Sequence, residues 1–174
     1  NEYQQGNLHE AKKLLERELK SNTEDSFLLG FLATIEKALG NKRRSLKLFE
    51  RSTKIDRSNP DVLNNYSELL AEIDAKRAIE ISDAAVALSP KNSRYLERNG
   101  FLRWQAGDLH NALDATTKAL KIDSDRIYSL MNLGGIYRDL GELDKALFFT
   151  LKSLKINPKN PIVHINLGRI YKDL

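Results

Sequence analysis

Side chains that could do covalent or metal chemistry are few in this chain and lie far apart. Histidine is the usual general base and metal ligand near neutral pH, and the chain has only His9, His110 and His164. No two of them stand at metal-ligand spacing from each other. The sequence has no GxSxG, HExxH, Walker A or GxGxxG motif, and the pair Gly134-Gly135 follows no strand that would make it a phosphate loop. We therefore expect no enzyme activity, no metal and no cofactor.

The composition indicates a water-soluble chain with an apolar core. Of its 174 residues, 41% are hydrophobic and 30% charged, with a formal net charge of +4. The longest basic cluster is Lys42-Arg43-Arg44, which is too short to predict a nucleic-acid partner. No run approaches 18 apolar residues, so we expect no membrane contact. The absence of cysteine is compatible with a reducing compartment, and we expect a cytoplasmic location.

The sequence repeats itself with a period of 34 residues. The block beginning at Asn132 (NLGGIY) returns at Asn166 (NLGRIY), and the block beginning at Gly107 (GDLHNAL) returns at Gly141 (GELDKAL). A constant period of this length is typical of stacked structural repeats. The register predicts a half unit over 1–25, complete units over 26–59, 60–92, 93–126 and 127–160, and a half unit over 161–174.

Each unit reads as two helices joined by a tight turn. Leu130, Leu133 and Ile136 show the apolar spacing of a first helix. A glycine follows, which suits a left-handed helix end, and a second helix then ends near a proline such as Pro158. The turn glycines are Gly6, Gly40, Gly107 and Gly141. The 60–92 unit lacks this glycine.

Small residues recur at two fixed places in the units. At the eighth place stand Ala33, Ser67, Gly100, Gly134 and Gly168, and at the twentieth stand Ser45, Ala78, Ala112 and Ala146. Because a small side chain lets two helix backbones approach closely, these places predict tight contact within each helix pair.

In its period and its small residues, the chain resembles the tetratricopeptide repeat (TPR) family. The resemblance covers the whole chain and is strongest over 93–174. Over 1–92 it is weaker: Glu36 replaces the usual first-helix tyrosine, and Arg57 stands where proline is common. The resemblance implies an all-α superhelix, or solenoid, of helix–turn–helix units. It also implies a protein–protein interaction module whose concave groove binds an extended peptide or a partner helix.

By analogy with the family, first helices line this groove. The resemblance implies these groove residues: Asn65, Arg94, Arg98, Phe101, Trp104, Tyr128, Asn132, Arg138, Asn166 and Arg169.

Three asparagines, Asn65, Asn132 and Asn166, stand at the same place in their units. An amide offers both donors and an acceptor, so it can pair with the C=O and N–H of an extended peptide. Some TPR proteins use such an asparagine ladder. The alternative is that asparagine is simply common at this place and faces water.

Asn65, Arg94 and Arg98 resemble the later part of the carboxylate clamp of chaperone-binding TPR domains. Cations beside an amide donor suit a C-terminal carboxylate. The first two clamp places, however, hold Gly30 and Thr34, which supply neither charge nor amide. The alternative is that these arginines form ion pairs with nearby acids.

The aromatic residues Phe101, Trp104 and Tyr128 are of types that dominate binding hot spots. Trp104 is the only tryptophan, and its alternative role is packing against its own hairpin.

The two ends of the sequence are compatible with more than one function. The chain opens with Asn1 and the last helix carries Ile162, Ile165 and Ile170, so we expect a fragment of a longer chain. The last helix then packs on a further repeat or self-associates as a homo-oligomer. Besides a binding module, the chain could be the substrate-recognition arm of a larger transferase, or a scaffold.

Overall fold

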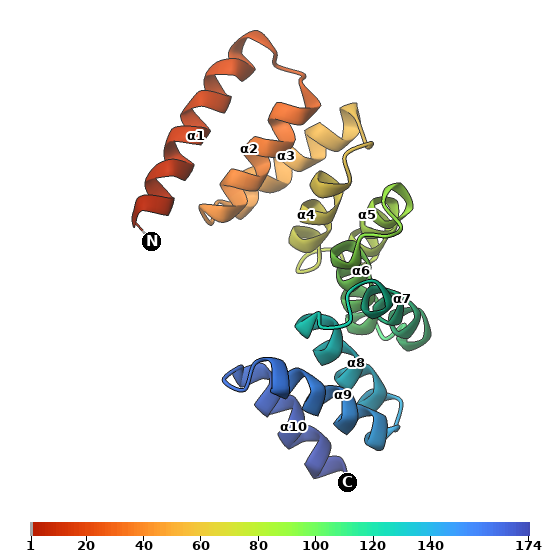
Figure 1. Ribbon diagram of the computed structural model, residues 1–174. Helices are drawn as coiled ribbons and strands as arrows, with labels where there is room; N and C mark the ends of the chain where they lie inside the picture. Colours follow the sequence, from red (N-terminus) through yellow and green to blue (C-terminus); the bar gives the residue numbers. More distant parts are fainter. Residues whose placement is uncertain (1) are drawn as a thin grey trace. The chain divides into compact units, whose positions relative to one another are not determined.

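The computed structural model describes the backbone from Glu2 and the side chains from Gly6 to the end of the chain. Over residues 2–174 it contains helices and no strand (Figure 1). These helices are α1 (Glu2–Ser21), α2 (Ser26–Ala38), α3 (Lys42–Ile55), α4 (Pro60–Leu70), α5 (Ala75–Leu88), α6 (Ser93–Gln105), α7 (Leu109–Ile122), α8 (Ile127–Asp139), α9 (Leu143–Ile156) and α10 (Pro161–Asp173).

The chain forms two compact units. Unit 1 extends to Leu88 and contains α1–α5, and unit 2 covers Ser89–Leu174 and contains α6–α10. Within them, consecutive helices pair as the hairpins α2/α3, α4/α5, α6/α7 and α8/α9. First helices also touch along each unit, α2 with α4, α6 with α8, and α8 with α10. Each predicted complete repeat contains one of these hairpins.

Local sequence signals define the helix ends. Asn59 Oδ1 accepts the backbone N–H of Val62 at 3.2 Å, so it caps α4 ahead of Pro60. Three helix-to-helix turns inside hairpins pass through Gly40, Gly107 and Gly141, whose φ angles are 81°, 79° and 78°. Glycine enters this left-handed region without a steric penalty, so the predicted turns at these three positions are confirmed.

The predicted turn at Gly6 is wrong. Gly6 lies inside α1, which runs without interruption from Glu2 to Ser21, so the segment 1–25 holds one long helix. Glycine costs only about 1 kcal/mol in a helix interior. It is followed by a run of strong helix formers that begins with Leu8 and Glu10.

The small residues bring paired helices into contact, as predicted. Ala33 and Ser45 are fully buried, and Ser45 Oγ donates to the backbone oxygen of Ala33 at 2.7 Å. At Gly134, a Cβ atom would lie 2.3 Å from Thr150 Oγ1 of the paired helix. That distance is shorter than any real contact, so a larger residue at this crossing of α8 and α9 would force Thr150 to rotate or the two helices to move apart.

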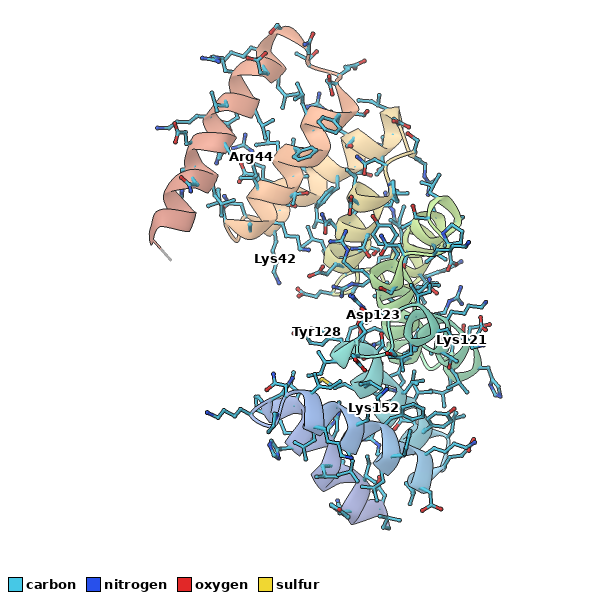
Figure 2. The ribbon with its side chains drawn as sticks, in the orientation of Figure 1. Lys42, Arg44, Lys121, Asp123, Tyr128 and Lys152 are labelled. Carbon is cyan, nitrogen blue, oxygen red and sulfur yellow. The ribbon has the colours of Figure 1, made fainter. Side chains whose placement is uncertain are left out.

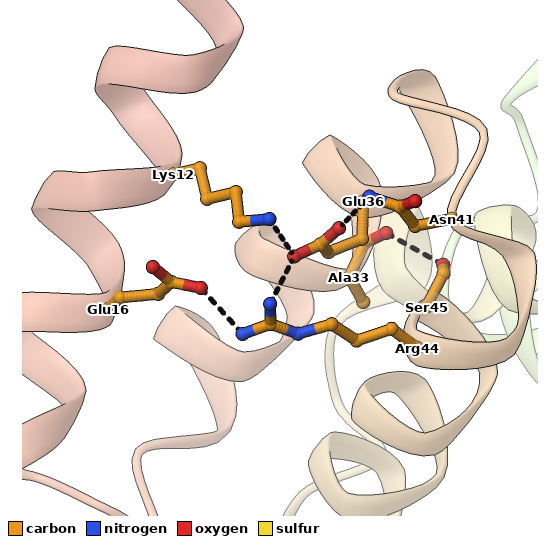
Figure 3. Close-up of polar contacts among 7 residues, drawn as sticks. All are labelled: Lys12, Glu16, Ala33, Glu36, Asn41, Arg44 and Ser45. Carbon is orange, nitrogen blue, oxygen red and sulfur yellow. Dashed lines mark hydrogen bonds and ion pairs between the residues drawn. The ribbon is translucent and has the colours of Figure 1, made fainter.

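A buried carboxylate ties α1 to the first hairpin. Glu36 stands at the place of the usual tyrosine and is fully buried. Its Oε1 lies 3.0 Å from Lys12 Nζ of α1 and 3.0 Å from Arg44 Nη1 of α3, which extends toward α1 (Figures 2 and 3). Asn41 Nδ2 donates to its Oε2 at 2.6 Å. A second ion pair, from Arg44 to Glu16, also reaches α1.

These contacts set the ionisation of Glu36. Burial of the carboxylate raises its pKa, but hydrogen bonds from Lys12 and Asn41 and the charge of Arg44 outweigh burial. The pKa of Glu36 is therefore lower than its ordinary value of 4.5. A carboxylate with a lowered folded-state pKa contributes stability above its unfolded pKa, and this stability is lost as the pH falls through the folded-state value.

We predict that Glu36→Gln lowers the free energy of unfolding by about 1–3 kcal/mol at neutral pH, because a charged hydrogen-bond acceptor is lost. The difference from the unaltered chain should shrink as the pH falls below 4.5. Urea unfolding at about pH 7 and pH 3 measures both effects.

The matched control is Glu72→Gln, which removes an exposed ion pair to Lys42. Such pairs contribute about 0–1 kcal/mol. The account of Glu36 fails if both variants lose the same stability, or if Glu36→Gln keeps the full pH dependence.

Candidate functional site

A groove of about 630 Å³ runs across the first helices of unit 2. The residues that line it come from α6, α8 and α10 and from the turn before α8: Arg94, Glu97, Arg98, Phe101, Trp104, Arg126, Tyr128, Met131, Asn132, Ile162, Asn166 and Arg169.

Helical spacing brings these side chains to one side of each helix. On α6 the lining residues Arg94, Arg98 and Phe101 follow one another at intervals of four and three, which places them on one face. On α10, Ile162, Asn166 and Arg169 follow the same intervals. Figure 2 shows Tyr128 of α8 on the opposite side of unit 2 from Lys121 of α7.

The one carboxylate that lines the groove is already bound. Glu97 Oε2 lies 2.7 Å from Arg126 Nε, and its Oε1 accepts Arg126 Nη2 at 3.0 Å. Ser129 Oγ also donates to Glu97 Oε2 at 3.1 Å. One charged hydrogen bond and a close ion-pair contact thus join Arg126 to Glu97, and they hold the start of α8 against α6.

Trp104 is fixed by α8, the first helix of the next hairpin. Its indole Nε1 donates to Asp139 Oδ2 at 2.7 Å, and its ring covers Gly135, where a Cβ atom would lie 2.1 Å from Trp104 Cη2. Phe101 meets it edge-on, with ring centroids 6.3 Å apart. Trp104 therefore lines the groove with an orientation set by its contacts with α8.

Two asparagines in the groove are nearly buried without a hydrogen-bond partner. Asn132 is 8% exposed and Asn166 is 9% exposed. Within residues 6–174, neither side-chain amide makes a hydrogen bond to the protein. Neither amide is among the buried polar groups that lack a partner, so both still face the opening of the groove, where they can donate to and accept from a ligand.

Eight of the ten residues predicted for the groove meet in it; Asn65 and Arg138 do not line it. Asn65 lies in unit 1, where its Nδ2 donates to Thr34 Oγ1 at 3.4 Å. Arg138 pairs with Asp139 and lies 3.9 Å from Asp173, because its guanidinium turns toward those acids.

Four lining residues are not among the ten that the resemblance implied: Glu97, Arg126, Met131 and Ile162. Ile162 stands at the second place of its unit, as Arg94 and Tyr128 do in theirs, so applying the same place rule to the last half unit identifies it. Arg126 precedes the first residue of its helix, and only its ion pair with Glu97 brings it to the groove.

Gly30, which stands at the first place of the carboxylate clamp, has a packing role in this chain. A Cβ atom at Gly30 would lie 2.5 Å from Val62 Cγ2, so this position serves the close packing of α2 on α4. Thr34 Oγ1 in turn donates to the backbone oxygen of Gly30 at 3.0 Å.

Membrane and metal features were sought in the described part of the chain. None of its helices is long and apolar enough to cross a membrane. Nor do three or more histidine, aspartate or glutamate side chains gather there at a site that could hold a metal ion.

Comparison with known proteins identifies the repeat. The family model of the tetratricopeptide repeat matches residues 127–160, the predicted fourth complete unit. The chain contains a tetratricopeptide repeat at these residues. The TPR repeat-containing protein MJ1428 of Methanocaldococcus jannaschii is 31% identical to it over 95 residues, which cover 53% of this chain. The match spans only 16% of that relative.

Solved structures agree on the fold. YrrB, described as a TPR protein with an unusual peptide-binding site, has a TM-score of 0.81 at 18% identity and covers 97% of this chain and 85% of its own. TTC0263, a thermophilic TPR protein of Thermus thermophilus, has a TM-score of 0.71 at 22% identity, with coverages of 98% and 93%. The all-α repeat fold predicted from the sequence is therefore confirmed.

We predict that Gly135→Ala displaces the indole of Trp104. The new methyl group would occupy the position of the ring, so Trp104 would swing away and lose its hydrogen bond to Asp139. Since Trp104 is the only tryptophan, its fluorescence emission should shift to longer wavelength as the ring enters water.

Gly168→Ala is the matched control, because nothing lies within 4 Å of a Cβ atom there. Its emission should equal that of the unaltered chain. An unchanged spectrum for Gly135→Ala would contradict the described position of Trp104.

Proposed function

We propose that this chain is a non-catalytic interaction module that binds an extended peptide segment of a protein partner in the groove of unit 2. Its match to a family of protein-interaction modules supports this assignment. The observation that carries it is the pair Asn132 and Asn166, nearly buried, without partners and lining one groove.

The amides suit a peptide backbone. Each can donate to a backbone carbonyl and accept from a backbone N–H, which holds an extended chain without selecting its side chains. They stand 34 residues apart, on the adjacent helices α8 and α10. A peptide lying across these two helices can therefore meet both, while its side chains reach Phe101 and Trp104.

The test removes both amides. A display library of random peptides is selected on the unaltered chain, and the affinity of the selected peptides is measured for the double variant Asn132→Ala, Asn166→Ala. Each lost hydrogen bond contributes about 0.5–1.5 kcal/mol, so binding should weaken about tenfold. Circular dichroism checks that the variant remains folded.

Asn111→Ala is the control, since Asn111 is exposed on α7 and does not line the groove. It should bind the selected peptides as the unaltered chain does. Equal affinity of the double variant, or no peptide selected at all, would overturn the assignment.

A second candidate function is self-association through α10. Ile165 and Tyr171 are exposed on this helix. Nothing lies within 4 Å of a Cβ atom at Gly168 between them, whereas the equivalent Gly134 of α8 faces Thr150 of its paired helix. A second copy of the chain could cover this apolar surface. Sedimentation equilibrium over a range of concentrations decides: rising mean mass supports it, and a constant monomer mass opposes it. The cytoplasmic location and the absence of a nucleic-acid partner stay predictions.

A further inference from the structure

The charges around the groove are unequal. Four arginines and one glutamate line it, and the glutamate, Glu97, is bound by Arg126 and Ser129. Asp139, next to Trp104, is also engaged, because it accepts from the indole and from Arg138. Three of the arginines have partners as well: Arg126 is bound to Glu97, and Arg94 and Arg98 each have a contact of their own. The lining as a whole still carries more positive than negative charge.

Arg169 adds a cation at the α10 side of the groove. Within residues 6–174 its guanidinium forms no ion pair, and it lies one turn beyond Asn166 on the same face of α10. Guanidinium binds carboxylate through two parallel hydrogen bonds, which is stronger than a neutral hydrogen bond. A ligand held by Asn166 can thus place an acidic side chain against Arg169.

The same groove has an apolar wall. Trp104 is held in place by Gly135 and Asp139, with Phe101 beside it. Tyr128 and Ile162 also line the groove and remain exposed. Covering such side chains is favourable by about 25 cal/mol per Å² of apolar surface, and an orientation that is set beforehand lowers the entropic cost of binding.

We infer that the preferred ligand is an extended, acidic peptide segment with one large apolar side chain between its carboxylates. The apolar side chain seats against Trp104 and Phe101, and side-chain carboxylates face the arginines. This inference rests on the proposed function and names the chemistry of the partner. A basic segment is repelled by the arginines, and a purely acidic one leaves the apolar wall in water.

The experiment compares four peptides of equal length with both ends blocked, so that every carboxylate belongs to a side chain. The first has glutamates on both sides of a central phenylalanine. The others replace the glutamates with glutamine, the glutamates with lysine, or the phenylalanine with alanine. Fluorescence anisotropy gives the affinity of each, at low and at high salt.

The first peptide should bind about tenfold more tightly than the glutamine and alanine peptides, which corresponds to about 1.4 kcal/mol. The lysine peptide should bind weakest, and salt should weaken the first peptide most. Arg169→Gln should reduce the affinity for the glutamate peptide by a larger factor than the affinity for the glutamine peptide. Lys121→Gln, which removes a charge on the other side of unit 2, should change neither.

The possible failures are distinguishable. If the four peptides bind equally and all lose affinity in the Asn132→Ala, Asn166→Ala variant, the proposed function stands and the inferred preference is overturned. The preference is also overturned if the lysine or glutamine peptide matches the glutamate peptide, or if Lys121→Gln acts as Arg169→Gln does. If no peptide binds, both the preference and the proposed function are wrong.

Discussion

Close approach of two helices within each hairpin is the constraint on which the rest of the structure depends. A Cβ atom at Gly134 would lie only 2.3 Å from Thr150 Oγ1 of the paired helix, and a Cβ atom at Gly100 only 2.2 Å from Thr116 Oγ1. At these two crossings a Cβ atom would displace the facing threonine or move the helices apart, so the glycines permit the short distance between the helix backbones. Helices that approach this closely pack as tightly as any protein interior, and a single added methyl group must be accommodated by movement.

This spacing positions the groove. Because α8 is held on α9, its other side is presented to α6 and α10, and its lining residues meet theirs. Trp104 of α6 can cover α8 only because Gly135 has no side chain. The adjacent glycines Gly134 and Gly135 thus serve two different contacts, one that closes a hairpin and one that supports a groove wall. The surface of the groove is a consequence of how the helices pack.

Much of this arrangement could be predicted from the sequence, because a period of 34 residues fixes helix places, turn glycines and groove positions together. The features that the sequence did not predict depend on individual contacts between residues that do not stand at equivalent places of the repeat. Arg138 turns to Asp139 and Asp173, and Arg126 reaches the groove through Glu97. Gly6 matches the turn register, yet it continues a helix, since one glycine does not end a run of helix-forming residues.

The most direct test of the close-approach constraint compares the free energies of unfolding of Gly134→Ala and Gly168→Ala. Both glycines stand at the eighth place of their units, but only Gly134 faces a paired helix within the described residues. Alanine at 168 should stabilise the chain by up to about 1 kcal/mol through helix propensity. Alanine at 134 should destabilise it by about 1–3 kcal/mol through overpacking. Stabilisation by both substitutions would show that the helices have room to spare and would contradict this account.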